Sequence, residues 1–171
     1  MEGERRPVPI SRRPMDLFLV AFFLMNIPVV VLFESQVILP PGVVPKQLSD
    51  ATQWYVNASG DYLVGEKPAF LKGLVVAEVL FQLPLMIANA YSFTAGKDWG
   101  RITGVIYAAH VATTMFPLFA DILAAKVATQ NLLLGIYMPY LIVPLIMLAR
   151  LAPSPHPFTE AVASLKTKKG Q

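Results

Sequence analysis

The stretch LFLVAFFLMNIPVVVLFESQVIL, residues 17–39, decides the class of this fold. Only Asn26, Glu34, Ser35 and Gln36 interrupt its apolar character, and it exceeds the about 20 residues that a helix needs to cross a hydrocarbon core. A secretory signal has a shorter apolar region and ends at a small-residue cleavage site, and neither feature is found here. We therefore predict that this segment is retained as a first membrane span.

The composition of the whole chain agrees with this prediction. Of 171 residues, 55% are hydrophobic and 15% are charged, whereas soluble domains have about 45–50% apolar and about 25% charged residues. The chain has no cysteine, which excludes a disulfide framework, thiol catalysis and a cysteine metal site.

Three more apolar segments follow, and short joints between the last three make those helices antiparallel neighbours. Each span holds a proline, which kinks a helix and lets the helices splay around a cavity, although proline is also common in membrane helices in general. We predict an all-α membrane protein, a single domain over residues 1–171 that forms a four-transmembrane-helix bundle with proline-kinked helices. The expected spans are residues 17–39, 70–95, 102–125 and 132–151.

The positions of the basic residues predict the orientation in the membrane. Ten of the fourteen Lys and Arg residues lie near the two chain ends or in the joint at residues 96–101, so the positive-inside rule puts both ends in the cytosol. The tails would be residues 1–16 and 152–171. Residues 40–68 would then form a structured lumenal loop, with one short helix at 47–55 and a formal glycosylation sequon at Asn57.

Lys168 and Lys169 lie at the fourth and third positions from the carboxyl end. This spacing matches the dilysine signal that returns membrane proteins to the endoplasmic reticulum, which is read on a cytosolic tail. The alternative is a basic tail that lies on anionic lipid headgroups.

Two acids inside the spans indicate a site. An ionisable group at the membrane centre costs about 2.5–3.5 kcal/mol, so such groups usually face the interior of a bundle. Glu34 and Glu78 fall at similar depth, and Gln82 lies four positions after Glu78 on the same helical face. A carboxyl pair that shares one proton would form an anionic site for an amine with an apolar body. Alternatively, Glu34 reaches lumenal water and a neutral Glu78 pins two helices together.

Hydroxyl groups of the third and fourth spans could complete such a site. Tyr107 and Thr114 share one face of the third span, and Tyr137 and Tyr140 flank Pro139 in the fourth. The lone histidine of the third span, His110, is typical of a hydrogen bond between helices. The sequence has no metal-binding motif, no phosphate-binding loop and no nucleic-acid motif, so we expect no metal, no cofactor and no nucleic-acid partner.

Five sequence segments, in this order along the chain, resemble those of a known family. The segments are IPVVVLFESQVILP, QWYVNASGDYL, EVLFQLP, IYAAHVATTMFP and YMPYLIVP, followed by the lysine-rich tail. Together they resemble the sigma-2 receptor family, four-helix proteins of the endoplasmic reticulum in the EXPERA group, which also contains the emopamil-binding sterol isomerases.

The resemblance implies roles for individual positions. It implies that Glu34 contacts the cation of a ligand, that Glu78 supports Glu34, and that Gln82 belongs to the same site. Further site residues implied in this way are Tyr55, Asp61, Tyr107, Thr114 and Tyr140. The sequence departs from the family pattern at two positions, since Glu34 stands for aspartate and Asn26 for histidine, and the longer glutamate keeps the charge but changes its reach.

Three functions follow as alternatives. The resemblance implies a non-enzymatic protein of the endoplasmic-reticulum membrane that binds sterols, oxysterols and cationic amphiphiles and takes part in sterol homeostasis and trafficking, as a homodimer and with sterol-transport proteins as partners. A sterol isomerase that uses paired carboxylates is the second alternative, because a site for an ammonium also suits a carbocation-like transition state. A scaffold whose acids only pin helices is the third. The isomerase branch has a fifth helix, so the four spans here favour binding.

Overall fold

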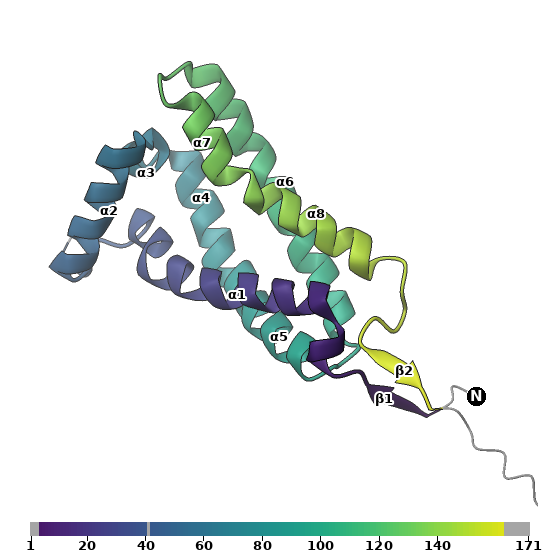
Figure 1. The fold of residues 1–171 in the computed structure, drawn as a ribbon. Coiled ribbons are helices and arrows are strands. Elements are labelled where there is room, and N and C mark those ends of the chain that lie inside the picture. Colours follow the sequence, from purple (N-terminus) through teal and green to yellow (C-terminus); the bar gives the residue numbers. More distant parts are fainter. Residues whose placement is uncertain (1–3, 41, 163–171) are drawn as a thin grey trace, which may run out of the picture.

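The computed structural model describes residues 4–40 and 42–162, so Lys168 and Lys169 lie outside the described residues. Four helical segments are long and apolar enough to cross a membrane, and each of their ends lies within three residues of the predicted one. These spans are Pro14–Val37, Ala69–Thr94, Gly100–Ala125 and Gln130–Leu151. Figure 1 shows them as an elongated bundle with both described chain ends at the same pole. The prediction of a four-span all-α membrane fold is confirmed.

The first span is α1, Pro14–Leu32, followed by a 3₁₀ turn at Glu34–Val37. Pro14 stands in the first turn of the helix, where its missing N–H leaves no internal bond unmade. Pro28 lies inside α1, and the helix continues past it. Glu34 is therefore placed where the regular helix gives way to the tighter turn.

The second span is interrupted at its centre. Helix α4, Ala69–Ala77, runs into a π turn at Glu78–Gln82, and α5 follows at Leu83–Thr94. Pro84 has no N–H to offer the carbonyl of Leu80, and its ring crowds that carbonyl. The N–H of Leu83 bonds to the carbonyl of Glu78, five residues back, rather than to the carbonyl four residues back. This is the pattern of a π-bulge.

The third span is α6, Gly100–Ala125, and the fourth consists of α7, Gln130–Tyr137, and α8, Pro139–Leu151. Helices α7 and α8 are separated at Met138, because Pro139 is the first residue of α8 and cannot continue the bonds of α7. All four spans thus carry an interruption or an internal proline, as the sequence predicted.

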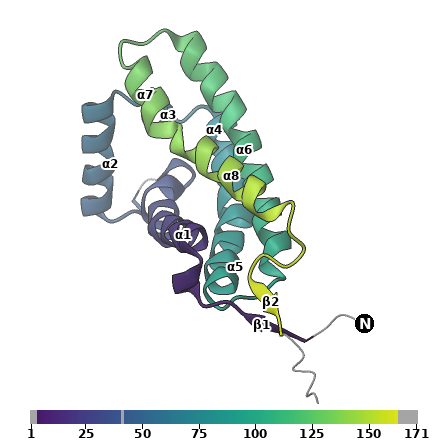
Figure 2. The ribbon, with the colours of Figure 1, turned by 45° about the vertical axis from the view of Figure 1, so that its right-hand side comes forward.

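The loop between the first two spans contains more helix than we expected. Instead of one short helix at residues 47–55, it forms α2, Lys46–Ser59, and α3, Tyr62–Glu66. Gly60 ends α2 in the left-handed conformation (φ 66°), a usual helix stop. The Tyr62 hydroxyl donates to Asp121 of α6 at 2.6 Å and docks α3 on the bundle. In both ribbon views α2 stands beside the spans rather than among them (Figures 1 and 2).

Small residues let α6 approach its neighbours closely. Gly100 and Gly104 are both buried and form a GxxxG pair of the kind that brings membrane helices together. A Cβ at Gly104 would lie 2.5 Å from a methyl of Leu151 on α8, and one at Gly100 would lie 2.1 Å from the Ser92 hydroxyl of α5. The motif is therefore used within one chain.

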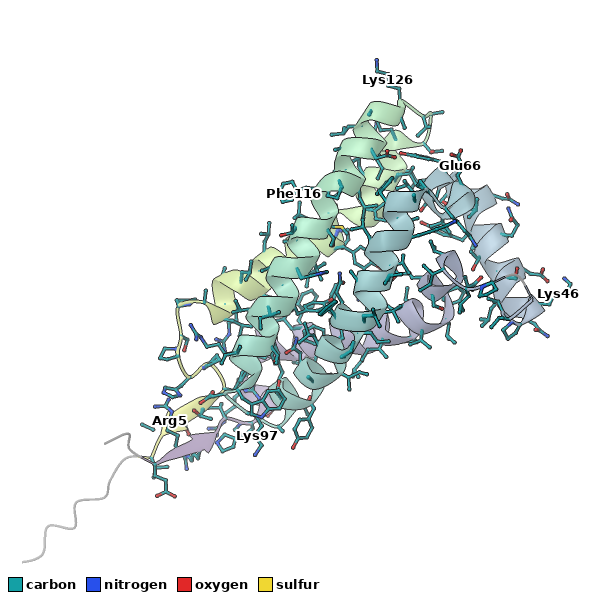
Figure 3. All side chains as sticks on the ribbon, turned by 180° about the vertical axis from the view of Figure 1, so that it is seen from behind. Arg5, Lys46, Glu66, Lys97, Phe116 and Lys126 are labelled. Atoms are coloured by element: carbon teal, nitrogen blue, oxygen red, sulfur yellow. The ribbon has the colours of Figure 1, made fainter. Side chains whose placement is uncertain are left out.

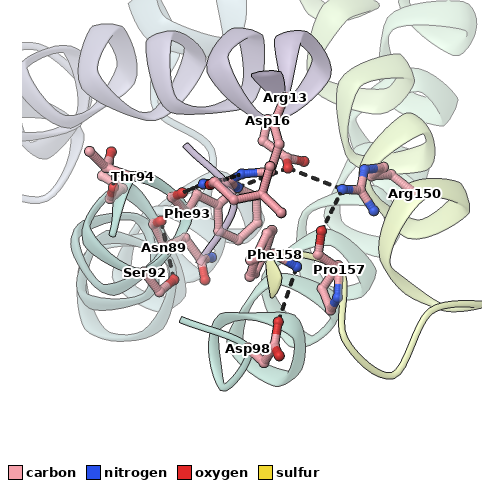
Figure 4. Close-up of polar contacts among 12 residues, drawn as sticks. Arg13, Asp16, Asn89, Ser92, Phe93, Thr94, Asp98, Arg150, Pro157 and Phe158 are labelled. Carbon is pink, nitrogen blue, oxygen red and sulfur yellow. Dashed lines mark hydrogen bonds and ion pairs between the residues drawn. The ribbon is translucent and has the colours of Figure 1, made fainter. Parts of the chain in front are cut away.

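A polar cap closes the pole that carries the chain ends (Figure 4). Asp16 is fully buried and accepts hydrogen bonds from Arg13 at 2.9 Å and Arg150 at 3.1 Å. Arg150 also donates to the carbonyl of Pro157, and Arg13 lies over the ring of Phe158 at 5.2 Å. The cap thus ties the start of the first span to the end of the fourth.

Two short strands extend this cap, and the sequence did not predict them. Strand β1, Arg5–Pro7, pairs antiparallel with β2, Thr159–Ala161. Asp98, in the turn between α5 and α6, accepts from the Phe158 N–H at 3.0 Å and from the Thr159 hydroxyl. Partial burial of Asp98 acts to raise its pKa, but these hydrogen bonds and the nearby His156 outweigh burial and lower the pKa below its usual value. Figure 3 shows Arg5 and Lys97 at this pole, with Lys126 and Glu66 at the other.

Candidate functional site

A cavity of about 470 Å³ lies inside the half of the bundle that carries α2 and α3. All four spans and α2 contribute to its walls, and most of the lining side chains are apolar. The volume is within the about 300–1,000 Å³ range of pockets for small ligands. The kinked and interrupted helices of the bundle therefore enclose room for an amphiphile.

Eight of the nine predicted site residues line this cavity, and they come from all four spans and α2. They are Glu34, Tyr55, Glu78, Gln82, Tyr107, Thr114, Tyr137 and Tyr140. The ninth, Asp61, does not line the cavity. The geometry brings the predicted group together, while a ligand-binding role for it stays a prediction.

The carboxyls of Glu34 and Glu78 lie close enough across the first and second spans to share a hydrogen bond. An ionised carboxyl can only accept hydrogen bonds, so a bond between two carboxyls requires a proton on one of them. A pair that holds a single proton carries one negative charge. Among residues 4–40 and 42–162, Oε2 of Glu34 has no hydrogen-bond partner although it is buried. Such a position is costly for a charged group unless a further donor or cation reaches it.

Asp61 does not line the cavity, but it bonds to two tyrosines that do. Its side chain is fully buried and accepts from the hydroxyls of Tyr55 at 2.8 Å and Tyr137 at 2.9 Å. Its other oxygen accepts the N–H of Val64 at 3.2 Å and so caps α3. Burial, followed by the charge of Asp61, raises the pKa of Tyr55, so this phenol stays protonated and donates. Asp61 therefore holds a tyrosine of α2 and one of α7, and we name these three side chains the Asp61 clamp.

Gln82 faces the cavity from the end of the π turn. Its amide pairs with Nδ1 of His110 on α6 at 3.0 Å, and the ring of Phe81 stacks on the imidazole. His110 is thus the hydrogen bonder between helices that the sequence indicated. This contact orients the Gln82 amide, because the amide nitrogen is paired with His110 of α6.

Several lining residues were missed by the sequence analysis. Trp54 and Thr52 of α2 reach the cavity, although the side chain of Trp54 is 72% exposed at the same time. Asn26 and Met86 line it from α1 and α5. A signal for Asn26 was present, since it is the one polar residue within the apolar run before Glu34, but we had noted it only as a departure from the family pattern.

The described residues give no indication of a metal site at this cavity. Within residues 4–40 and 42–162, no group of three His, Asp or Glu side chains is arranged to hold a metal ion. The cavity offers two neighbouring carboxyls, several hydroxyls and a large apolar surface.

Comparison with known proteins gives a consistent result. Residues 47–151 match the family described as EXPERA, the expanded EBP superfamily. The chain is 32% identical to sigma intracellular receptor 2 of Xenopus tropicalis, over 85% of this chain and 92% of the relative, and 29% identical to the Homo sapiens protein of that name, over 86% and 93%. It is also 29% identical to the Saccharomyces cerevisiae protein called efficient mitochondria targeting-associated protein 19, over 51% of this chain and 61% of the relative.

Proposed function

The chain belongs to the EXPERA family, and from this premise we propose that it is a receptor-like protein whose cavity binds sterols, oxysterols and cationic amphiphiles. One observation carries the proposal. Two neighbouring acids, Glu34 and Glu78, lie on the wall of a largely apolar cavity inside a membrane bundle, and one buried oxygen of Glu34 has no hydrogen-bond partner among the described residues.

The chemistry of the cavity suits an amphiphile with a basic nitrogen. An ammonium near the acid pair gains a charge-assisted hydrogen bond, which is about twice as strong as a neutral one. Phenol rings of Tyr137 and Tyr140 border the same space and can contact a cation through their faces. The apolar lining would enclose a sterol or another fused-ring body.

The cellular setting is part of the proposal. The dilysine pair Lys168 and Lys169 and the distribution of basic residues support residence in the endoplasmic-reticulum membrane with both ends in the cytosol. In that setting the protein would act in sterol homeostasis and trafficking, as a homodimer and with sterol-transport proteins as partners. A GxxxG pair that is occupied within the chain means that a dimer would need another face.

A sterol isomerase is the second candidate, and the shared proton of the acid pair favours it. One carboxyl could deliver its proton to a ring double bond, and the resulting carbocation would lose a proton from a neighbouring carbon to the other carboxylate. The double bond would shift with no net gain or loss of protons. Complementation of a strain without sterol isomerase separates the candidates: rescue that depends on both Glu34 and Glu78 would establish the enzyme and displace the receptor.

Ligand binding by Glu34→Gln tests the proposed function directly. The probes are a tertiary amine with an aromatic tail and a neutral amide of the same shape, titrated into protein in nanodiscs. We expect the variant to bind the amine about tenfold to a hundredfold more weakly, the value of a hydrogen bond to a charged group, and the amide equally well.

The matched control is Glu66→Gln, which removes an exposed carboxyl at the end of α3, away from the cavity lining. It should leave both affinities unchanged. Unchanged amine affinity in Glu34→Gln and in the Glu34→Gln/Glu78→Gln double variant would remove the acid pair from recognition. Mass spectrometry of lipid that co-purifies with the protein would identify the natural occupant.

A further inference from the structure

Asn26 lines the cavity about two helical turns from the acid pair, on the side towards the pole that carries the chain ends. It comes eight residues before Glu34 on the first span, while Met86 comes eight residues after Glu78 on the antiparallel second span, and both line the cavity. At 1.5 Å of rise per residue, this level is about 12 Å from the acids. Beyond it the apolar core begins, where the rings of Phe23 and Tyr107 pack edge to face at 5.3 Å.

Asn26 is polar and only 3% exposed, and its own chain satisfies only part of it. Nδ2 donates to the carbonyl of Phe22 at 2.8 Å. This leaves Oδ1 as the atom that the side chain can present to the cavity, and no donor from residues 4–40 or 42–162 pairs with it. Tyr107 also lines the cavity, and its ring packs on Phe23, three residues before Asn26. Its hydroxyl forms no hydrogen bond with residues 4–40 or 42–162.

An acceptor and a phenol at one end of an apolar space suit a ligand hydroxyl. A hydroxyl donates one hydrogen bond and accepts others, so it could donate to Asn26 Oδ1 while it accepts from Tyr107. A ligand that ends in a methyl would leave both groups buried and unpaired, and an unpaired buried group costs more than the bond itself gains.

We propose that Asn26 and Tyr107 form a hydroxyl-recognition site, and that the preferred ligands carry a basic nitrogen and a hydroxyl about 12 Å apart. This inference rests on the proposed function, because it takes the acid pair as the site of the nitrogen. It adds a second polar contact and therefore a length requirement that the acids alone would not impose.

A purely structural role for Asn26 leads to different results. Pro28 leaves the carbonyl of Leu24 without its helical partner, and a side chain that bonds to the carbonyl four residues back often accompanies a bend. In that role Asn26 would affect the stability of α1 but not the choice between two ligands. The decisive readout is therefore a ratio of affinities.

The test compares dimethylaminononanol with dimethyldecylamine, in which a methyl replaces the hydroxyl. Both are titrated into the full chain in nanodiscs by calorimetry. We expect the wild type to prefer the amino alcohol about threefold to tenfold, the value of one neutral hydrogen bond. Asn26→Leu, which has similar size and no polar atoms, should abolish the preference and still bind the methyl compound.

The matched control is Thr113→Val. The Thr113 hydroxyl also bonds to the carbonyl four residues back, that of Ala109, but its side chain is exposed and outside the cavity lining. This variant should keep the preference. A preference that persists in Asn26→Leu, or its absence from the wild type, would overturn the inference.

A second measurement uses only the wild-type protein. The hydroxyl preference is measured in the wild type with dimethylaminohexanol, dimethylaminononanol and dimethylaminododecanol, each against its methyl-ended partner. A maximum at the middle length supports the spacing, and a flat profile refutes it. If Glu34→Gln does not weaken binding of any of these amines, the proposed function fails; if only the length dependence is missing, the hydroxyl site fails and the proposed function stands.

Discussion

Replacement of Asp61 by alanine should destabilise the protein by about 4 kcal/mol. The carboxylate accepts three hydrogen bonds, from Tyr55, from Tyr137 and from the N–H of Val64. Loss of the cap on α3 costs about 1 kcal/mol, and each bond to the charged group is worth about 1.5–3 kcal/mol. The two phenols border the cavity and can find other partners there, so the lower part of the sum is expected.

Four further variants divide this cost. Asp61→Asn keeps the size and can still pair with both phenols, so it should cost about 1–2 kcal/mol through loss of the charge. Tyr55→Phe and Tyr137→Phe each remove one bond and should cost about 1–2 kcal/mol. The double Phe variant should cost more than the sum of its parts, because it leaves a buried carboxylate with only the backbone bond.

The measurement is reversible unfolding in mixed micelles, followed for the wild type and all five variants under one condition. Ligand dissociation is measured on the same samples, since the Asp61 clamp joins α2 to α7 across the cavity and its loss should speed release. Equal costs for Asp61→Ala and Asp61→Asn, or no cost for either Phe variant, would show that the clamp does not stabilise the wall.

Three other predictions concern separate parts of the bundle. Gly104→Ala should lower the unfolding free energy by about 1–3 kcal/mol by overpacking, whereas Gly73→Ala, which has open space around it, should be neutral or stabilising in the same assay. Hydrogen bonds lower the pKa of Asp98. The contribution of Asp98 to the free energy of unfolding is therefore complete above its ordinary pKa and is lost as the pH falls through the lowered value. Asp98→Asn should accordingly flatten the dependence of the unfolding free energy on pH below about pH 4. A double-mutant cycle of Gln82→Leu and His110→Phe on amine affinity should show coupling of about 0.5–1.5 kcal/mol, and additivity would mean that His110 does not orient the amide.

Length and hydrophobicity were sufficient to predict the four spans. An apolar segment that is long enough to cross the bilayer forms a membrane-spanning helix, because its backbone groups must be hydrogen-bonded within the segment. The equal depth of Glu34 and Glu78 followed from the antiparallel order of two spans. These features depend on counting along the chain, which a sequence permits without knowledge of packing.

Packing decided the features that the sequence analysis missed. The burial of Asp16 depends on Arg13 and on Arg150, which is 134 residues away, and no local pattern records such a pairing. The π turn at Glu78–Gln82 has a local cause in Pro84, yet the same residue type leaves α1 helical at Pro28. Whether a proline bends a helix or changes its hydrogen-bond register depends on which neighbours can accept the displaced groups.

The positions of the prolines explain why the cavity lies at the level of the acids. Pro28 comes six residues before Glu34, and Pro84 comes six residues after Glu78, so in antiparallel spans both prolines fall at one depth. Each weakens the helical hydrogen bonding of its own span there, and the two spans can diverge from that level towards the acid pair. The divergence leaves space between them that the lining side chains do not fill. The two acids would destabilise a closely packed interface between helices. Here they border a space that can hold a cation.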